Sequence, residues 1–261
     1  GNANKMMARL LYHIAEEKSY RLSEIYGGSK DNVIAMEAHA SLVAAPEDTE
    51  QILAMIRNME DVWNAEFMGE EPGLTVKTET EKNTDTVVFS KDTTQKVVGY
   101  LKASPNGLKE YSRKVAGATE TSLNLGILEL KEDALTSLTS IRSSVKTRKE
   151  DLCARVTMLV EMLGGEAEVE GDYPAWEYRT DSALRPQVEK VYEELFHKKL
   201  VFSTIHAGLE CGLLSEKIPD LDCVSFGPDN FDIHTPKEHL SISSTARVWD
   251  FLVAFLQQAN V

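Results

Sequence analysis

The stretch that decides how the C-terminal part of the chain folds is Leu200-Val201-Phe202-Ser203-Thr204-Ile205-His206-Ala207-Gly208-Leu209-Glu210-Cys211-Gly212. Its first residues, 200–205, form a short and nearly unbroken apolar run, which is typical of a strand buried on both faces. A helix is expected over 209–216, and a second apolar run follows at 223–226. The order strand, helix, strand predicts the edge of a parallel sheet, and the pattern over 246–257 predicts an amphipathic closing helix.

Two histidines follow these predicted strands, and side chains just past parallel strands lie at the carboxyl ends, where sites form. His206 comes directly after the first run, and His234 lies between Gly227-Pro228 and Thr235-Pro236. Proline restricts the backbone, so we expect His234 on a rigid, non-helical loop that suits a metal ligand. Spacing alone leaves open that it is a loop histidine without a function.

The N-terminal part predicts a different architecture. Helical spacing of apolar residues indicates helices over 6–18 and 46–67, with strands at 20–26 and 33–44 between them and at 74–80 and 86–89 after them. The order then recurs as a helix over 94–102, strands over 116–130 and 135–143, a helix over 146–163 and a strand over 166–178. This predicts an α+β domain, an antiparallel sheet with helices on one face, built from two related α-β-β-α-β units. An unduplicated α+β sheet is the alternative. A helix over 184–197 follows, and we place the domain boundary at residue 199, giving domains 1–199 and 200–261.

Composition excludes several classes of function. The formal net charge of −14 opposes sequence-independent nucleic-acid binding and docking on an anionic membrane. No apolar run approaches the roughly 20 residues that span a bilayer, and the first residues lack the layout of an export signal. The three cysteines, Cys153, Cys211 and Cys223, lack CxxC spacing. We therefore expect reduced thiols and a cytoplasmic protein.

Several short motifs in order along the chain resemble the aminoacyl-histidine dipeptidases, the peptidase D or bacterial carnosinase-like group of the aminoacylase/carboxypeptidase-like co-catalytic zinc peptidases. The C-terminal motifs are Ile205–Leu213 (IHAGLECGL), Glu216–Pro219 (EKIP), Leu221–Pro228 (LDCVSFGP) and His234–Glu238 (HTPKE). The upstream motifs are Asn2–Lys5 (NANK), Asp31–Ala38 (DNVIAMEA), Pro105–Gly107 (PNG), Glu120–Gly126 (ETSLNLG), Ile141–Ser144 (IRSS) and Tyr173–Trp176 (YPAW).

The resemblance implies that 1–199 is a lid, also used for homodimer contacts, and that 200–261 is the C-terminal segment of a catalytic domain split by the lid. It implies that His234 binds one of two divalent ions, zinc or else manganese or cobalt, that activate water to attack a peptide carbonyl. The family's other ligands and its general base precede the lid, and no H-x-D motif occurs here. The Glu-Glu pairs at 16–17, 70–71 and 193–194 are in the wrong order and are expected to be solvated.

The resemblance also points to four substrate-contact candidates. His206 and Glu210 flank a glycine-bearing loop that faces substrate in the family, although a purely structural role is equally open. Asn32 matches a lid asparagine, with Ala35 in place of the family's proline, which puts the rigidity of that loop in doubt. Arg142 would suit a substrate carboxylate, but a surface charge is the alternative. We expect His39 to be structural, and Trp176, Trp249 and Phe251 to lie in the core.

Two functions remain open on the sequence. In the first, the chain is part of a metal-dependent dipeptidase for Xaa-His dipeptides and is inactive alone, with no catalytic residue of its own and no bound metal, because an N-terminal catalytic half is missing. In the second, it is a non-catalytic dimerisation or regulatory module. Two metals bound only after an N-terminal half is supplied would favour the first.

Overall fold

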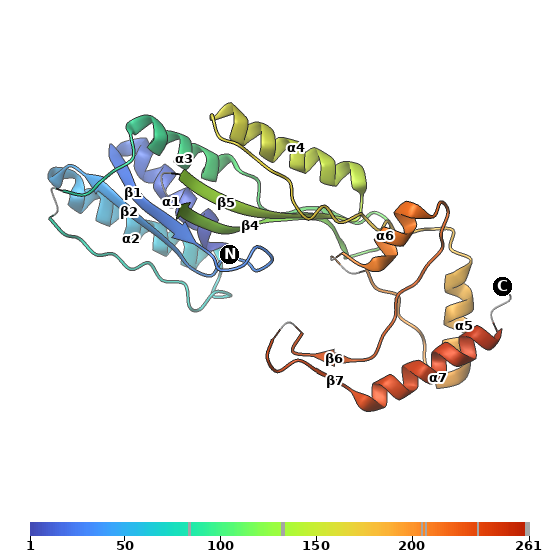
Figure 1. Cartoon of the computed structure of the whole chain (residues 1–261). Coiled ribbons are helices and arrows are strands. Elements are labelled where there is room, and N and C mark those ends of the chain that lie inside the picture. The colour runs from blue at the N-terminus through green and yellow to red at the C-terminus, as the bar shows by residue number, and fades with distance from the viewer. Residues whose placement is uncertain (83–84, 132–133, 205, 207, 234, 259–261) are drawn as a thin grey trace. The chain divides into compact units, whose positions relative to one another are not determined.

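The computed structural model describes all residues except 83–84, 132–133, 205, 207, 234 and 259–261. The chain divides into two compact units. The first comprises residues 1–110, 121–142 and 147–170, and the second comprises residues 111–120, 143–146 and 171–261. Figure 1 labels the elements of both units.

The first half of the chain forms helices α1 (Ala3–Glu17), α2 (Thr49–Glu66) and α3 (Lys91–Ala103), the short 3-10 helix η1 (Pro46–Asp48), and strands β1 (Tyr20–Gly27), β2 (Ala38–Ala44) and β3 (Gly107–Tyr111). The second half forms strands β4 (Thr119–Lys131), β5 (Ala134–Ser143), β6 (Asn230–Phe231) and β7 (His239–Leu240), and helices α4 (Lys146–Met162), α5 (Leu184–Phe196), α6 (Glu210–Lys217) and α7 (Ile242–Gln258).

The larger sheet has the strand order β2-β1-β4-β3, with β5 paired to β4. β1 pairs antiparallel with β2 and with β4, which confirms the predicted antiparallel sheet. The register of β1 against β2 shifts between Leu22 and Glu24. This bulge changes which positions face inward, so that Leu22 and Ile25 are both fully buried although they are an odd number of residues apart.

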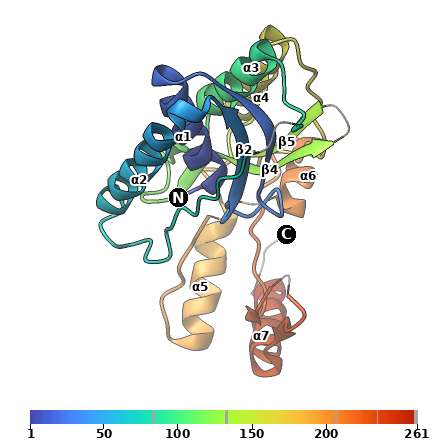
Figure 2. The same cartoon turned by 90° about the vertical axis from the view of Figure 1, so that its left-hand side faces the viewer.

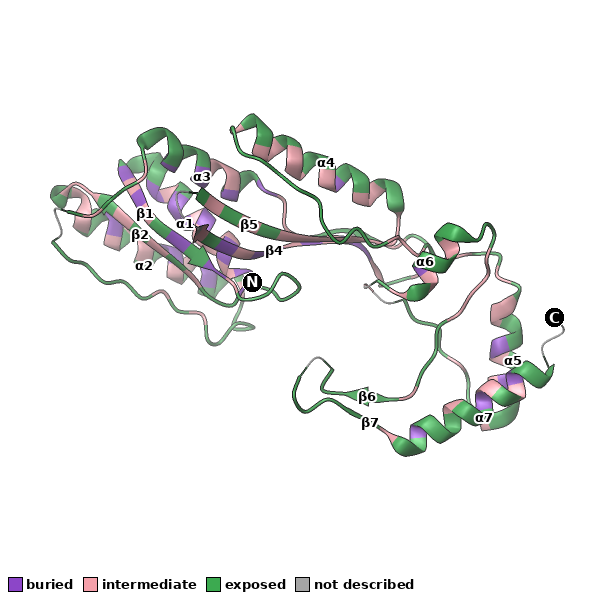
Figure 3. Ribbon diagram, viewed as in Figure 1, coloured by how far each residue is buried: buried purple, intermediate pink, exposed green. Residues whose placement is uncertain are grey.

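The core of the first unit lies between the sheet and helices α1, α2 and α3 (Figure 2). α1 buries Leu11 and Ile14 at helical spacing, and α2 adds Met59 and Trp63. Buried positions are concentrated on these elements in Figure 3. The prediction of helices packed on one face of the sheet is confirmed for these three helices.

Several predicted strands are wrong. Residues 74–80, 86–89 and 166–178 form no strand, and β3 is an additional one. The described part of the chain therefore shows α-β-β-α followed by α-β-β-β-α rather than two α-β-β-α-β units. A strand exists only when its backbone pairs with a neighbour. Here Val76 N–H donates to a side chain, Glu60 Oε1 at 3.2 Å, and Phe89 N–H makes a single 2.7 Å bond to Leu22 O.

The second unit has a small core in which α5 packs on α7. Val188 and Val191 of α5 and Phe251 and Phe255 of α7 are buried together. The predicted helices 184–197, 209–216 and 246–257 are present as α5, α6 and α7. Of the predicted parallel strands, residues 200–204 and 223–226 are irregular, and residue 205 lies outside the described residues. Trp249 was expected in the core but is 65% exposed.

Candidate functional site

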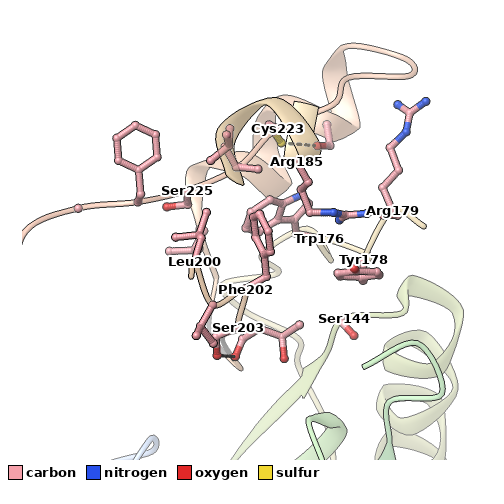
Figure 4. A pocket seen from close by; sticks show the side chains of 18 of the residues that line it. Ser144, Trp176, Tyr178, Arg179, Arg185, Leu200, Phe202, Ser203, Cys223 and Ser225 are labelled. Atoms are coloured by element: carbon pink, nitrogen blue, oxygen red, sulfur yellow. Dashed lines mark hydrogen bonds between the residues drawn. The ribbon is translucent and has the colours of Figure 1, made fainter. Parts of the chain in front are cut away.

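A cavity of about 1210 Å³ lies within the second unit (Figure 4). Its apolar walls come from the irregular segments 174–179, 200–204 and 221–227 and from helices α5 and α7. They include Trp176, Leu200, Phe202, Val224, Phe226 and Phe251. The predicted strand segments thus supply a large apolar surface, which is the usual lining of a ligand or interaction site.

Phe251 anchors the wall that α7 contributes to the cavity. Its ring lies 5.0 Å from that of Phe226 and 5.6 Å from that of Tyr192, in both cases edge to face. Such pairs add about 0.5–1.5 kcal/mol beyond the area they bury. The helical side of the cavity is therefore fixed by aromatic packing, and the prediction that Phe251 is a core residue is confirmed by its 4% exposure.

Two arginines line the cavity with their cationic groups held in place. The Arg185 guanidinium lies over the ring of Tyr178, 4.1 Å from the ring centroid. Arg179 donates from Nη1 to Asp220 O at 2.6 Å and from Nε to Asp181 Oδ1 at 3.0 Å. The hydrogen bond from Arg179 lowers the pKa of Asp181. Both guanidinium groups are therefore held by partners within the second unit.

Asp222 joins the 221–227 segment to α5. Its Oδ2 accepts hydrogen bonds of 3.0 Å from Ser182 Oγ and from the backbone N–H of Leu184, the first residue of α5. Burial raises the pKa of Asp222, but these hydrogen bonds outweigh it and leave the pKa lowered. A carboxylate at a helix N-terminus is stabilised by the free N–H groups there, so Asp222 fixes one side of the cavity relative to another.

The segment around Gly208, which the resemblance marks as a glycine-bearing loop, adjoins this cavity. Leu209, the N-cap residue of α6, lines it. A Cβ on Gly208 would lie 2.5 Å from the Tyr173 ring, and one on Gly212 would lie 2.7 Å from Pro174 O. The glycines therefore allow this loop to pack closely on residues 173–174. His206 is half-buried, and Glu210, the first residue of α6, is exposed.

The other two substrate-contact candidates lie in the first unit. Asn32 is exposed on the segment that joins β1 to β2, and Arg142 is half-buried in β5. They belong to a different unit from His206 and Glu210, which lie in the second unit. His39 stacks on Tyr26 with ring centroids 4.6 Å apart, which agrees with the structural role predicted for it.

His234 lies outside the described residues, but its flanks are well defined. Residues 230–231 and 239–240 pair as the antiparallel strands β6 and β7. Thr235 donates from Oγ1 to Asp232 O at 2.7 Å and from its backbone N–H at 3.1 Å, and Asn230 Nδ2 donates to Glu238 Oε1 at 3.0 Å. The described residues on the two sides of position 234 are thus joined by hydrogen bonds, and the rigid loop expected at His234 itself stays a prediction.

Among the side chains that the structure describes there is no group of three or more His, Cys, Asp or Glu residues that could hold a metal ion. These side chains do not include that of His234. The described residues therefore do not form a metal centre by themselves. The predicted Glu-Glu pairs at 16–17, 70–71 and 193–194 are exposed.

The sequence interpretation missed Arg179 and Arg185. They flank the Asp181-Ser182 pair that precedes α5, and an acidic or hydroxyl residue before a helix is a start signal. Such a signal indicates a helix but gives no reason to expect a cavity beside it, because the cavity's opposite wall comes from residues 200–227. Within the same described ranges, no helix has the length and apolar character needed to cross a membrane.

Comparisons with known proteins place these observations in a family context. Residues 3–258 match the profile of peptidase family M20/M25/M40. The chain is 30% identical over 258 residues to the cytosol non-specific dipeptidase of Escherichia coli K12, covering 99% of this chain and 53% of that relative. It superposes on the crystal structure of aminoacylhistidine dipeptidase from Vibrio alginolyticus with a TM-score of 0.89 and 34% identity, covering 98% of this chain and 52% of that one. The chain thus spans about half the length of these relatives.

Proposed function

The chain belongs to peptidase family M20/M25/M40, and on that premise we propose that it is part of a metal-dependent dipeptidase that hydrolyses Xaa-His dipeptides. The observation that carries the proposal is the match to aminoacylhistidine dipeptidase, which extends over 98% of this chain at 34% identity and a TM-score of 0.89. The motifs that resemble this group are spread over both units, so the likeness does not depend on one segment.

In this proposal residues 1–199 form the lid and residues 200–261 form the C-terminal segment of the catalytic domain. The exposed apolar surface of α7 supports the idea that another polypeptide segment packs against residues 200–261. Phe251 and Phe255 face α5, yet other apolar side chains of the same helix are exposed: Ile242 at 88%, Trp249 at 65%, Val253 at 36% and Leu256 at 62%. The apolar stripe of a helix normally packs against another element, and these exposed residues form a second apolar stripe on α7.

We assign that partner to the catalytic half that the relatives have in addition, since this chain corresponds to 52–53% of their length. The same half would pair with segments 200–204 and 223–226 and convert them into the buried strands that their apolar sequence predicts. The large apolar cavity is then the face on which the two halves of the catalytic domain meet.

His234 is proposed as the ligand that this chain gives to a two-metal centre, with zinc as the expected ion and manganese or cobalt as alternatives. The hairpin of β6 and β7 supports this role, because it holds both flanks of His234 in a non-helical loop. The remaining ligands and the general base are assigned to the other half. The chain alone is therefore proposed to be inactive.

Substrate contacts are proposed from both parts of the chain. Asn32 and Arg142 would reach the dipeptide from the lid, Arg142 through the substrate carboxylate. His206 and Glu210 would contact it from the loop beside the cavity. We further propose a homodimer formed through the lid and a cytoplasmic location. The location is supported by the three free cysteines and by the name of the Escherichia coli relative.

A non-catalytic dimerisation or regulatory module was the alternative on the sequence. It is not favoured, because both relatives described above are dipeptidases by name.

Metal analysis with and without a supplied catalytic half tests the proposed function. The 261-residue chain is mixed with the polypeptide that corresponds to the other half of the Vibrio relative. Zn²⁺ or Mn²⁺ content is measured after gel filtration, together with hydrolysis of β-alanyl-histidine and of a dipeptide without histidine. We expect two equivalents of metal, and activity greatest on the histidine dipeptide, only in the recombined form.

His234→Ala is expected to lose about one equivalent of metal in this experiment. His197→Asn is the matched control, because it removes an imidazole from the same unit while asparagine tolerates the left-handed backbone at φ 55°. Tight binding of two metal ions by the chain alone would contradict the proposal. So would a recombined form that binds two metals but does not hydrolyse either dipeptide.

A further inference from the structure

The segment 28–37 between β1 and β2 carries the exposed Asn32, and its backbone is tied to the first unit at both ends. Ala35 is 2% exposed, and its carbonyl accepts a 2.8 Å hydrogen bond from Ala3 N–H at the start of α1. Gly28 N–H donates to Glu37 O at 3.0 Å. The replacement of the family's proline by Ala35 therefore does not leave this segment loose, because hydrogen bonds hold it instead.

Asn124 of β4 holds the middle of the segment. Its Nδ2 donates to Asp31 O at 3.0 Å and to Val33 O at 2.8 Å. These carbonyls belong to the residues directly before and after Asn32, so both hydrogens of one side-chain amide fix the backbone on either side of it. The Oδ1 of Asn124 accepts a 2.9 Å bond from Asn2 Nδ2. The Asn124 amide is thus bound at all three positions and cannot rotate without breaking a bond.

Close packing at Gly126 brings the segment onto β4. A Cβ at this position would lie 2.6 Å from Asp31 O and 2.7 Å from Asp31 Cα. Only glycine allows the backbone before Asn32 to approach the strand this closely. The close contact at Gly126 and the hydrogen bonds of Asn124 thus both hold the backbone at Asp31, directly before Asn32. The exposed side chains that follow, Val33 at 43% and Ile34 at 60%, are therefore presented on a fixed backbone.

We propose that Asn124 is a positioning residue for Asn32, holding the peptide groups on both sides of it so that its exposed amide meets the dipeptide in one fixed place. This inference rests on the proposed function, in which Asn32 contacts substrate. The physical advantage is that a backbone ordered before binding loses little conformational freedom when the substrate arrives. Side chains that contact substrate need such support from their neighbours to keep their geometry.

Hydrogen exchange on the 261-residue chain tests whether Asn124 orders the segment. In Asn124→Ala we expect the peptide covering 28–37 to exchange about tenfold faster than in the unchanged chain, as for loss of about one hydrogen bond. Asn106→Ala is the matched control. Asn106 is a half-buried asparagine before β3 whose Oδ1 accepts a 2.8 Å bond from Leu125 N–H, next to Asn124 on β4, so its removal costs β4 one hydrogen bond without removing a bond to segment 28–37. Unchanged exchange in Asn124→Ala would overturn the proposal.

A double-mutant cycle in the complete recombined enzyme tests whether Asn124 acts through Asn32. Hydrolysis by the unchanged enzyme is measured first, and its absence would overturn the proposed function and this inference with it. We expect Asn32→Ala and Asn124→Ala each to lower kcat/KM about tenfold. In the Asn32→Ala background, Asn124→Ala should cause no further loss, because a positioning residue has nothing left to position.

The remaining outcomes separate this inference from the proposed function. A kcat/KM that Asn32→Ala leaves unchanged, or losses that multiply in the double variant, would overturn the positioning role while the dipeptidase function stands. If Asn124→Ala does not fold, Asn124→Asp replaces it in both experiments. Aspartate keeps the shape and the acceptor for Asn2 but cannot donate to the two carbonyls, so the same non-additive loss is expected.

Discussion

The side-chain Nδ2 of Asn2 donates a 2.9 Å hydrogen bond to Oδ1 of Asn124, 122 residues further along the chain. Asn2 is also the N-cap of α1, since its Oδ1 accepts from Lys5 N–H at 3.1 Å. Its Nδ2 makes a further 3.0 Å bond to Leu125 O. A single residue, Asn2, therefore caps the start of α1 and also joins this helix to β4 in the sheet.

Replacing Asn2 should separate these two roles. Asn2→Ala removes the cap and both long-range bonds, and we expect the free energy of unfolding to fall by about 2 kcal/mol. Asn2→Ser keeps an oxygen that can cap the helix but does not reach Asn124, so a fall of about 1 kcal/mol is expected. Urea unfolding followed by circular dichroism measures both. Equal losses in the two variants would mean that the cap contributes nothing.

We expect alanine substitution to have opposite effects on stability at two glycines, Gly126 and Gly99. Gly126→Ala would place a Cβ 2.6 Å from Asp31 O, and we expect a loss of about 1–3 kcal/mol in unfolding free energy as the backbone shifts. Gly99→Ala in α3 meets nothing within 4 Å, and we expect a gain of about 0.5–1 kcal/mol because alanine favours the helix. Thermal melting of the two variants compares them. A neutral Gly126→Ala would show that segment 28–37 does not rest on β4.

Lys5 gives the first unit a dependence on alkaline pH. Its ammonium group binds the carbonyls of Leu101, Lys102 and Ser104 at the end of α3. Burial, and then the charges of Lys102 and Lys109, lower the pKa of Lys5 from 10.5 to about 8. Between these two values the folded protein has released a proton that the unfolded chain still binds, so the free energy of unfolding should rise with pH in this window.

Urea unfolding at pH 7, 8, 9 and 10 measures this effect as the difference between the unchanged chain and Lys5→Met. The difference should grow from pH 8 to 10, because only the unchanged chain carries the Lys5 proton linkage. Lys30→Met removes an exposed ammonium group from the same unit and controls for net charge. A difference that is constant over the range, or that shrinks with rising pH, would contradict the lowered pKa.

The helices and the first strand pair could be predicted from sequence because their signals are local. Apolar spacing in α1 and α2 and the change to alternating residues in β1 are properties of neighbouring positions. Within 74–80 and 166–178 the same alternation misled the interpretation, since strand formation also needs a pairing partner that a local pattern cannot supply. Segments 200–204 and 223–226 failed for the same reason, although their side chains do line the apolar cavity.

The candidate site could be predicted in part. The segment that contains His206 and Glu210 adjoins the cavity through Leu209, and the substrate contacts expected of these two side chains stay a prediction. The hydrogen bonds from Asn124 to the residues beside Asn32 could not be predicted, because the two segments are far apart in sequence and meet only where β1 pairs with β4. Trp249 was placed in the core on its size and helical spacing. Its exposure shows that spacing identifies an apolar face of α7 but not what covers it.

The neighbouring thiol of Cys223 should control how fast Cys211 reacts. Burial, followed by the charge and hydrogen bond of Cys223, raises the pKa of Cys211. Ser215, one helical turn after Cys211 on α6, lies 3.6 Å from the sulfur of Cys223, which places that thiol beside the same face of the helix. A raised pKa leaves less thiolate at pH 8, and thiolate is the reactive form.

Cys223→Ala removes two causes of the raised pKa of Cys211, the charge and the hydrogen bond of Cys223. Alkylation of Cys211 by iodoacetamide should therefore become faster, and its pH profile should move to lower pH. Peptide mass spectrometry measures the rate, with Cys153→Ala in α4 as the control that should not change it. A Cys211 rate that is unchanged or slower in Cys223→Ala would show that Cys223 does not set its reactivity.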